Sequence, residues 1–192
     1  MIDPVSISIS IVSLAISGAT MWFAWLKKGR LRMTKPTIVF FGFDAKPVVT
    51  AKIFLRTLLY STSARGKMVE GMYAKLRQAS KEETFSFWGY GETRTLSPGS
   101  GLYVGQTGVA ANHHFVLSPT RPSYQFTTGE YTIEVYARVV GQPRPLRLSD
   151  IQIALTVEQV TALATQRYGV MFELMPESEG YIGYLDERDQ PA

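Results

Sequence analysis

The stretch YTIEVYARVV, residues 131–140, shows the most regular alternation of side chains in the chain. Its odd-numbered positions carry Tyr, Ile, Val, Ala and Val, which would all lie on one face of a strand. Such alternation is typical of a strand that buries one face and exposes the other in an antiparallel sheet. The stretch therefore predicts a β fold for the region around it.

Further runs of β-branched and aromatic residues lie on both sides of this stretch, separated by turn residues such as Gly, Pro and Ser. We expect strands at 37–43, 52–60, 67–77, 84–90, 102–104, 114–117 and 146–155. Short strands at this spacing are typical of two packed sheets. The sequence thus predicts a mainly β fold, in which residues 36–192 form one β-sandwich domain.

Residues 129–137 have the pattern Gly-Glu-Tyr-x-Ile-x-Val-x-Ala, in which Tyr131 opens the alternating strand. This pattern resembles the tyrosine corner of immunoglobulin-like domains. The resemblance implies an immunoglobulin-like β-sandwich, with Tyr131 as the fold-defining residue and its hydroxyl bonded to backbone a few residues upstream. Because the chain has no cysteine, the Cys–Trp–Cys signature of antibody domains is missing, and the resemblance concerns the broader fold.

One short helix and a hairpin are expected after the last of these strands. Thr156 and Gln159 have the spacing of a capping box, with Thr156 as the N-cap. An apolar stripe follows at Val157, Val160, Leu163 and Ala164. Gly169 is expected to end the helix, and residues 170–175 and 180–185 predict the hairpin. Two roles fit this C-terminal extension: covering a sheet edge, and forming a docking surface for a partner.

The N-terminal segment 4–26, PVSISISIVSLAISGATMWFAWL, contains no acidic or basic side chain. At about 1.5 Å per residue this segment forms a helix of roughly 34 Å, long enough to cross a bilayer. The sequence therefore predicts that residues 1–35 form a single transmembrane helix, at about 4–26, followed by a basic collar. The expected membrane-interface residues are Trp22, Trp25, Lys27, Lys28, Arg30, Arg32 and Lys35.

The charges around this helix predict its orientation. No Lys or Arg precedes the helix and five follow it, and cation-rich flanks stay in the cytoplasm. We therefore expect a single-pass protein of a bacterial inner membrane, with the N-terminus outside and the sandwich in the cytoplasm. A cleaved signal peptide would need cations before its apolar core and small residues after it, but this segment ends with Trp22 and Trp25.

One side of the predicted helix carries small and hydroxyl-bearing residues. They are Ser6, Ser10, Ser13, Ser17, Thr20 and Ala24, spaced alternately by four and three positions. Small residues let helices approach closely in lipid, and hydroxyls can hydrogen-bond across the contact. This side is therefore a candidate helix-association face. The alternative is that each hydroxyl bonds back to a carbonyl one turn earlier in its own helix.

The charge of the chain bears on its partners. The chain has 20 Lys and Arg against 16 Asp and Glu, and removing the five collar cations and Asp3 leaves 15 of each. The positive charge therefore belongs to the collar, which favours contact with anionic membrane lipid. A neutral sandwich does not favour a nucleic-acid partner, because such proteins carry a basic face on the domain itself.

Residues that could support catalysis are few. His113 and His114 are the only histidines, and adjacent strand residues point to opposite faces, so one metal ion would rarely bind both. The glycines at 99–108 are not followed by Gly-Lys-Ser/Thr, and no nucleophile elbow occurs. We predict no catalytic residue, no cofactor, no metal and no small-molecule substrate.

The expected function is therefore that of a non-catalytic interaction or scaffold module, which binds a protein partner or a second copy of itself. Aromatic residues between 85 and 126 are candidates for its surface, if the two sheets do not cover them. By strand parity, Phe85 and Phe87 share one face while Trp88 and Tyr90 share the other. The alternatives are an envelope protein with a periplasmic sandwich, and a membrane-bound hydrolase with an unrecognised site.

Overall fold

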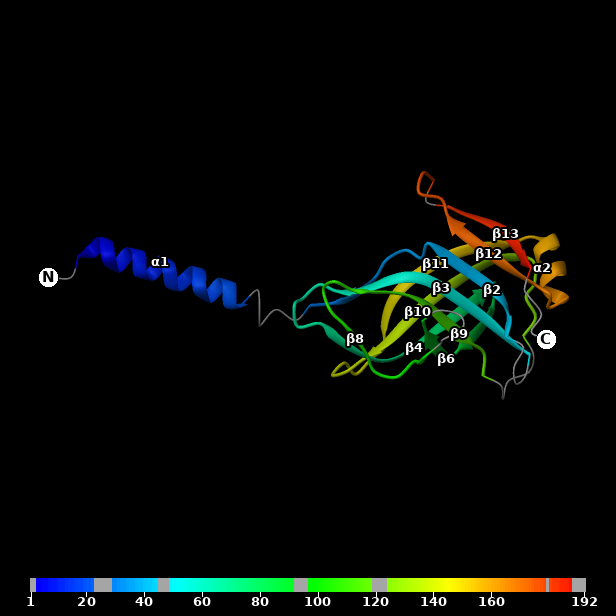
Figure 1. Cartoon of the computed structure of the whole chain (residues 1–192), viewed down its shortest axis with the longest axis horizontal. Coiled ribbons are helices and arrows are strands. Elements are labelled where there is room, and N and C mark those ends of the chain that lie inside the picture. The colour runs from blue at the N-terminus through cyan, green and yellow to red at the C-terminus, as the bar shows by residue number, and fades with distance from the viewer. Residues whose placement is uncertain are drawn as a thin grey trace.

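The computed structural model describes residues 3–22, 29–44, 49–91, 97–118, 124–178 and 180–187. It contains an N-terminal helix, α1 (Pro4–Met21), and a β body with one short helix, α2 (Val157–Ala164). Figure 1 shows that α1 extends from one end of the body, while α2 lies near the opposite end. The predicted mainly β fold with one apolar N-terminal helix and one short C-terminal helix is confirmed.

The larger sheet, sheet A, has eight strands, and every neighbouring pair is antiparallel. Seven strands follow the order β13-β12-β2-β3-β9-β6-β7, and β1 pairs with β3. The strands are β1 (Leu31–Met33), β2 (Ile38–Asp44), β3 (Thr50–Ser61), β6 (Phe87–Tyr90), β7 (Ser97–Pro98), β9 (Val109–Val116), β12 (Tyr168–Leu174) and β13 (Tyr181–Glu187).

The smaller sheet, sheet B, has five antiparallel strands. Four follow the order β11-β10-β4-β5, and β8 pairs with the first residues of β4. These strands are β4 (Lys67–Gln78), β5 (Lys81–Phe85), β8 (Leu102–Val104), β10 (Gly129–Val139) and β11 (Leu146–Leu155). The alternating stretch quoted first thus lies in β10, in the interior of sheet B.

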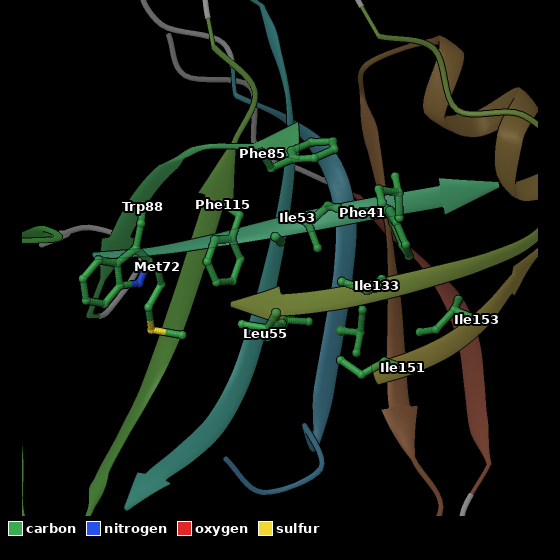
Figure 2. Packing of buried hydrophobic residues seen from close by; sticks show 14 of the residues in the cluster. Phe41, Ile53, Leu55, Met72, Phe85, Trp88, Phe115, Ile133, Ile151 and Ile153 are labelled. Carbon is green, nitrogen blue, oxygen red and sulfur yellow. The ribbon is translucent and has the colours of Figure 1, made fainter. Parts of the chain in front are cut away.

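The inward faces of the two sheets form one hydrophobic core. Figure 2 shows Ile53 and Leu55 of β3 beside Ile133 of β10, and all three side chains are completely buried. The outward residues of β10 are Glu130, Thr132, Glu134, Tyr136 and Arg138. The period-two pattern therefore predicts correctly which face of β10 is buried, because each sheet has one covered face.

Tyr131 makes the hydrogen bonds of a tyrosine corner. Its ring is 1% exposed, and its hydroxyl donates to the carbonyl of Thr127 at 2.8 Å. The backbone N–H of Thr127 donates back to the same hydroxyl at 2.7 Å. The predicted bond to upstream backbone is present, and it fixes the path of the chain as it enters β10.

The aromatic run 84–90 is two strands in two different sheets, which the sequence did not predict. The chain leaves sheet B after Phe85 and enters sheet A at Phe87, so Ser86 connects the two sheets. Phe85 and Trp88 both point into the core, whereas Phe87 is 57% exposed. The prediction that Trp88 and Tyr90 share a face is correct, since both pack on the core side of β6. The prediction that Phe85 and Phe87 share a face is wrong, because parity holds only within a continuous strand.

The start of the β body also differs from the prediction. Residues 31–33, expected in the basic collar, form β1 and pair with the end of β3, where Leu31 is 2% exposed. Gly29 is buried against Ser63, which lies close to where a Cβ at position 29 would be. The short strand was not visible in the sequence because its middle residue, Arg32, and the preceding Arg30 belong to the cationic run.

The C-terminal helix and hairpin form, but Gly169 does not end the helix: α2 ends at Ala164 with Thr165 as its C-cap, and Gly169 lies in β12. Thr156 caps α2, with the Thr156 hydroxyl accepting from Gln159 N–H and the Gln159 side chain accepting from Thr156 N–H. Strand β12 then pairs with β2, and β13 pairs with β12. The extension therefore continues sheet A beyond β2 instead of capping it, and β13 becomes the new edge strand.

Candidate functional site

Helix α1 is long and apolar enough to cross a membrane. Asp3 caps its N-terminus by accepting from Val5 N–H at 3.1 Å, and Pro4 occupies the first turn, where its missing N–H costs no hydrogen bond. No described residue of α1 is buried, and Leu14 in its middle is 75% exposed. An N-terminal signal sequence can also be long and apolar enough to meet this criterion.

The predicted helix-association face lies on α1 for five of its six residues, and Ala24 lies outside the described residues. Ser10 donates to the carbonyl of Ser6 at 2.9 Å, and Thr20 donates to that of Ile16 at 2.8 Å. No described group forms a hydrogen bond with the hydroxyls of Ser13 and Ser17, which lie one turn apart. These two hydroxyls are therefore the ones available to a neighbouring helix.

The expected membrane-interface residues divide into three groups. Trp22 is the C-cap of α1 and is 58% exposed, whereas Trp25, Lys27 and Lys28 lie outside the described residues.

The remaining three belong to the β body. Arg30 donates its N–H to the Thr62 hydroxyl at 2.8 Å, Arg32 lies in β1, and both side chains are exposed. The Lys35 ammonium lies 5.6 Å from the centre of the Tyr181 ring, a cation–π contact. The collar is therefore attached to folded structure from residue 29 onward.

The outward face of sheet A carries a row of apolar and aromatic residues that crosses five strands. In register they are Tyr184, Met171, Phe40, Phe54 and His114. The rings of Phe40 and Phe54 stack with centres 4.8 Å apart, and those of Phe54 and His114 are 5.1 Å apart. We call this set the aromatic row.

The aromatic row is most exposed at its β13 end. Phe40 is 2% exposed, and its ring lies over Gly42 and Gly169, where any side chain would collide with it. At the edge strand, Tyr184 is 41% exposed and Ile182 is 54% exposed. Apolar side chains on an edge strand are a common feature of protein–protein contacts. This row is not visible in the sequence because it exists only once five strands are in register.

The outward face of sheet B has the opposite character, because its charges pair with one another. Glu134 is 4% exposed, and its carboxylate lies 3.4 Å from an Arg77 nitrogen and 3.2 Å from an Arg147 nitrogen. Glu82 accepts from both Lys75 and Arg77 at 2.6 Å, and these bonds lower the pKa of Glu82. A face whose charges are matched internally offers little to a charged partner.

The two histidines point to opposite faces of β9. His113 lies in the core, where its Nδ1 accepts from the Trp88 indole N–H at 3.2 Å, while His114 lies in the aromatic row. Burial lowers the pKa of each to about 4, so both are neutral at pH 7. No group of three metal-ligating side chains occurs among the described residues.

A hollow of about 360 Å³ lies between the end of β2 and α2. Its lining includes Phe43, Phe126 and Leu163, and among the described lining residues Tyr124 is the one ionisable group. Burial raises the pKa of Tyr124, so this phenol stays protonated at neutral pH. The described lining of the hollow therefore offers mainly apolar contact.

Comparison with known proteins adds no assignment: no protein family, no curated protein and no solved structure matches this chain. The class of the protein therefore rests on its own residues. They define a mainly β protein of two sheets with an apolar N-terminal helix.

Proposed function

We propose that this chain is a single-pass membrane protein whose β body is a non-catalytic interaction module. The observation that carries the proposal is the exposed apolar surface of α1. Ile11, Leu14 and Ile16 are each more than 60% exposed, and each would cost roughly 1.5–3 kcal/mol to keep in water. A bilayer removes that cost, and the helix satisfies its own backbone hydrogen bonds.

Retention of the helix in the mature protein is favoured over its removal as a signal peptide. Trp22 suits a membrane interface, whereas a signal peptide would have small residues at the end of its apolar run. The cations after the helix support an N-out orientation with the body in the cytoplasm. Alkaline-phosphatase and GFP fusions at the C-terminus test this orientation: GFP fluorescence is expected, and phosphatase activity would favour the periplasmic alternative.

The body is best described as an immunoglobulin-like sandwich. The tyrosine corner of β10 supports this, and so does the strand order in both sheets. The order β2-β3-β9-β6 corresponds to strands A-B-E-D of that fold, and β5-β4-β10-β11 corresponds to C′-C-F-G. Strands β12 and β13 would then be an addition beside strand A. In this alignment Trp88 lies on strand D, not on strand C where antibody domains carry their buried Trp.

The partner is expected to be a protein or a second copy of this chain. The exposed apolar residues of the edge strand β13, Ile182 and Tyr184, support a contact there, since an edge strand can also pair through its backbone. The free hydroxyls of Ser13 and Ser17 support a second contact through α1 in the membrane.

Chemical crosslinking of the full chain in membranes, together with its mass in detergent, tests this assembly. We expect a crosslinked species in the parent protein. Its yield should be lower in the Ile182→Lys variant and in the Ser13→Leu/Ser17→Leu variant. The matched controls are Gln152→Lys, on the outward face of sheet B, and Ile9→Leu on α1. A strict monomer, with no species captured, would contradict the proposed assembly.

A further inference from the structure

One end of the β body gathers four segments that are far apart in the sequence. We call it the proximal end; it comprises residues 29–32, 61–70, 102–108 and 138–147. Backbone hydrogen bonds join them: Thr62 N–H donates to the carbonyl of Arg30 at 3.0 Å, and Val140 N–H donates to that of Met68 at 3.0 Å. Figure 1 shows these turns at the end of the body from which α1 extends.

The proximal end is strongly basic. It contains seven cations and one acidic residue, Glu70. Arg147 pairs with the carboxylates of sheet B. The other six form no ion pair with any described residue, and they are Arg30, Arg32, Arg65, Lys67, Arg138 and Arg144. This contrasts with the outward face of sheet B, where the charges are matched.

Exposed apolar side chains lie among these cations. Met68 and Tyr103 are cross-strand neighbours and are 40% and 55% exposed, and Val140 beside them is 54% exposed. Tyr103 is held in place because its hydroxyl donates to the carbonyl of Arg65 at 3.4 Å and its ring packs on Gly66. Tyrosine side chains with neighbouring cations are typical of protein surfaces that lie at the level of the lipid headgroups.

The chain keeps this end close to α1. Seven residue steps separate Trp22 from Gly29, which can span at most about 25 Å. A tether this short makes contact between the proximal end and a membrane an intramolecular event, so even a weak attraction suffices. Cations within about 8 Å of an anionic surface are attracted at physiological salt.

We propose that the proximal end docks on the anionic lipid surface into which α1 is inserted, so that the body has a fixed orientation on the membrane. The unpaired cations contact lipid phosphates, while Met68, Tyr103 and Val140 enter the headgroup layer. The distal turn between β4 and β5 then points away from the lipid. This inference rests on the proposed membrane anchor.

The chain has no cysteine, so a single introduced cysteine can carry a fluorescent label at one chosen position. The full chain is reconstituted in vesicles of phosphatidylcholine with 30% phosphatidylglycerol, some lipids bearing a spin label on the headgroup. Val140→Cys reports the proximal end, and Ser80→Cys in the exposed distal turn is the control. Leu14→Cys, with spin labels deep in the acyl chains, reports α1.

We expect strong headgroup quenching at position 140 and little at position 80. The Arg65→Glu/Arg144→Glu variant should lower the ratio of docked to undocked protein by at least about tenfold, as should pure phosphatidylcholine or high salt. The equally charged control Arg56→Glu/Lys81→Glu, away from this end, should leave it unchanged.

Two results would overturn the inference in different ways. Quenching at position 14 with equal quenching at 140 and 80 would leave the anchor in place and refute the docked orientation. Absence of acyl-chain quenching at position 14 would refute the membrane anchor, and the docking with it.

Discussion

Replacing Tyr131 by Phe tests the tyrosine corner by removing one oxygen atom. The ring stays buried, so the hydrophobic contribution is unchanged, but two hydrogen bonds to the backbone of Thr127 are lost. At about 0.5–1.5 kcal/mol each, their loss destabilises the protein by about 2 kcal/mol. Because Thr127 is exposed, water can hydrogen-bond to its backbone in place of the Tyr131 hydroxyl. The loss of stability therefore stays within this estimate.

The assay is thermal unfolding of the full chain in detergent, followed by tryptophan fluorescence. A loss of about 2 kcal/mol corresponds to a midpoint lowered by about 4–8 °C in a domain of this size. Tyr73→Phe is the matched control, because the Tyr73 ring stacks on Tyr136 and its hydroxyl bonds to no described group. A Tyr131→Phe midpoint within 1 °C of the parent would refute the structural role of the corner.

Three further predictions concern the rest of the β body. Burial lowers the pKa of His113 and of His114 from 6.5 to about 4. Between pH 4 and pH 6.5 the unfolded chain therefore binds more protons than the folded chain. The free energy of unfolding should therefore be highest above pH 6.5 and fall by up to about 1.4 kcal/mol per histidine for each pH unit below it. Denaturant titration should show that the free energy of unfolding of a His114→Gln variant falls less steeply between pH 6.5 and 5 than that of the parent. Glu134→Gln removes the charge held between Arg77 and Arg147 and should cost about 1 kcal/mol in the same titration, against less than about 0.5 for exposed Glu130→Gln; equal values would contradict the network. Gly169→Ala places a Cβ against the Phe40 ring and should cost about 1–3 kcal/mol, whereas Gly71→Ala, with nothing within 4 Å, should be nearly neutral; a neutral Gly169→Ala would contradict the packing of the aromatic row.

Local patterns predicted much of the β body. The strand at 131–140, the capping box at Thr156 and the C-terminal hairpin all depend on neighbouring residues, and each forms where its pattern indicates. The tyrosine corner was also visible, because Tyr131 and its partner Thr127 are four residues apart.

Features that depend on distant contacts were not predictable in the same way. Strand β1 has three residues and is stabilised by pairing with β3, almost 30 residues later. The change of sheet at Ser86 leaves the aromatic run unbroken in sequence, although it reverses which residues face inward. The aromatic row and the proximal end both require several strands in register, so no single segment reveals them.

The central claim is that α1 remains part of the protein and spans a membrane. Alkaline carbonate extraction of cell membranes, followed by the intact mass of the chain in each fraction, tests it most directly. We predict that the full chain of 21.4 kDa remains in the membrane pellet, and that Leu14→Arg, which places a charge in mid-helix, releases it. A soluble chain that has lost its first two dozen or so residues would identify the segment as a signal peptide and contradict the claim.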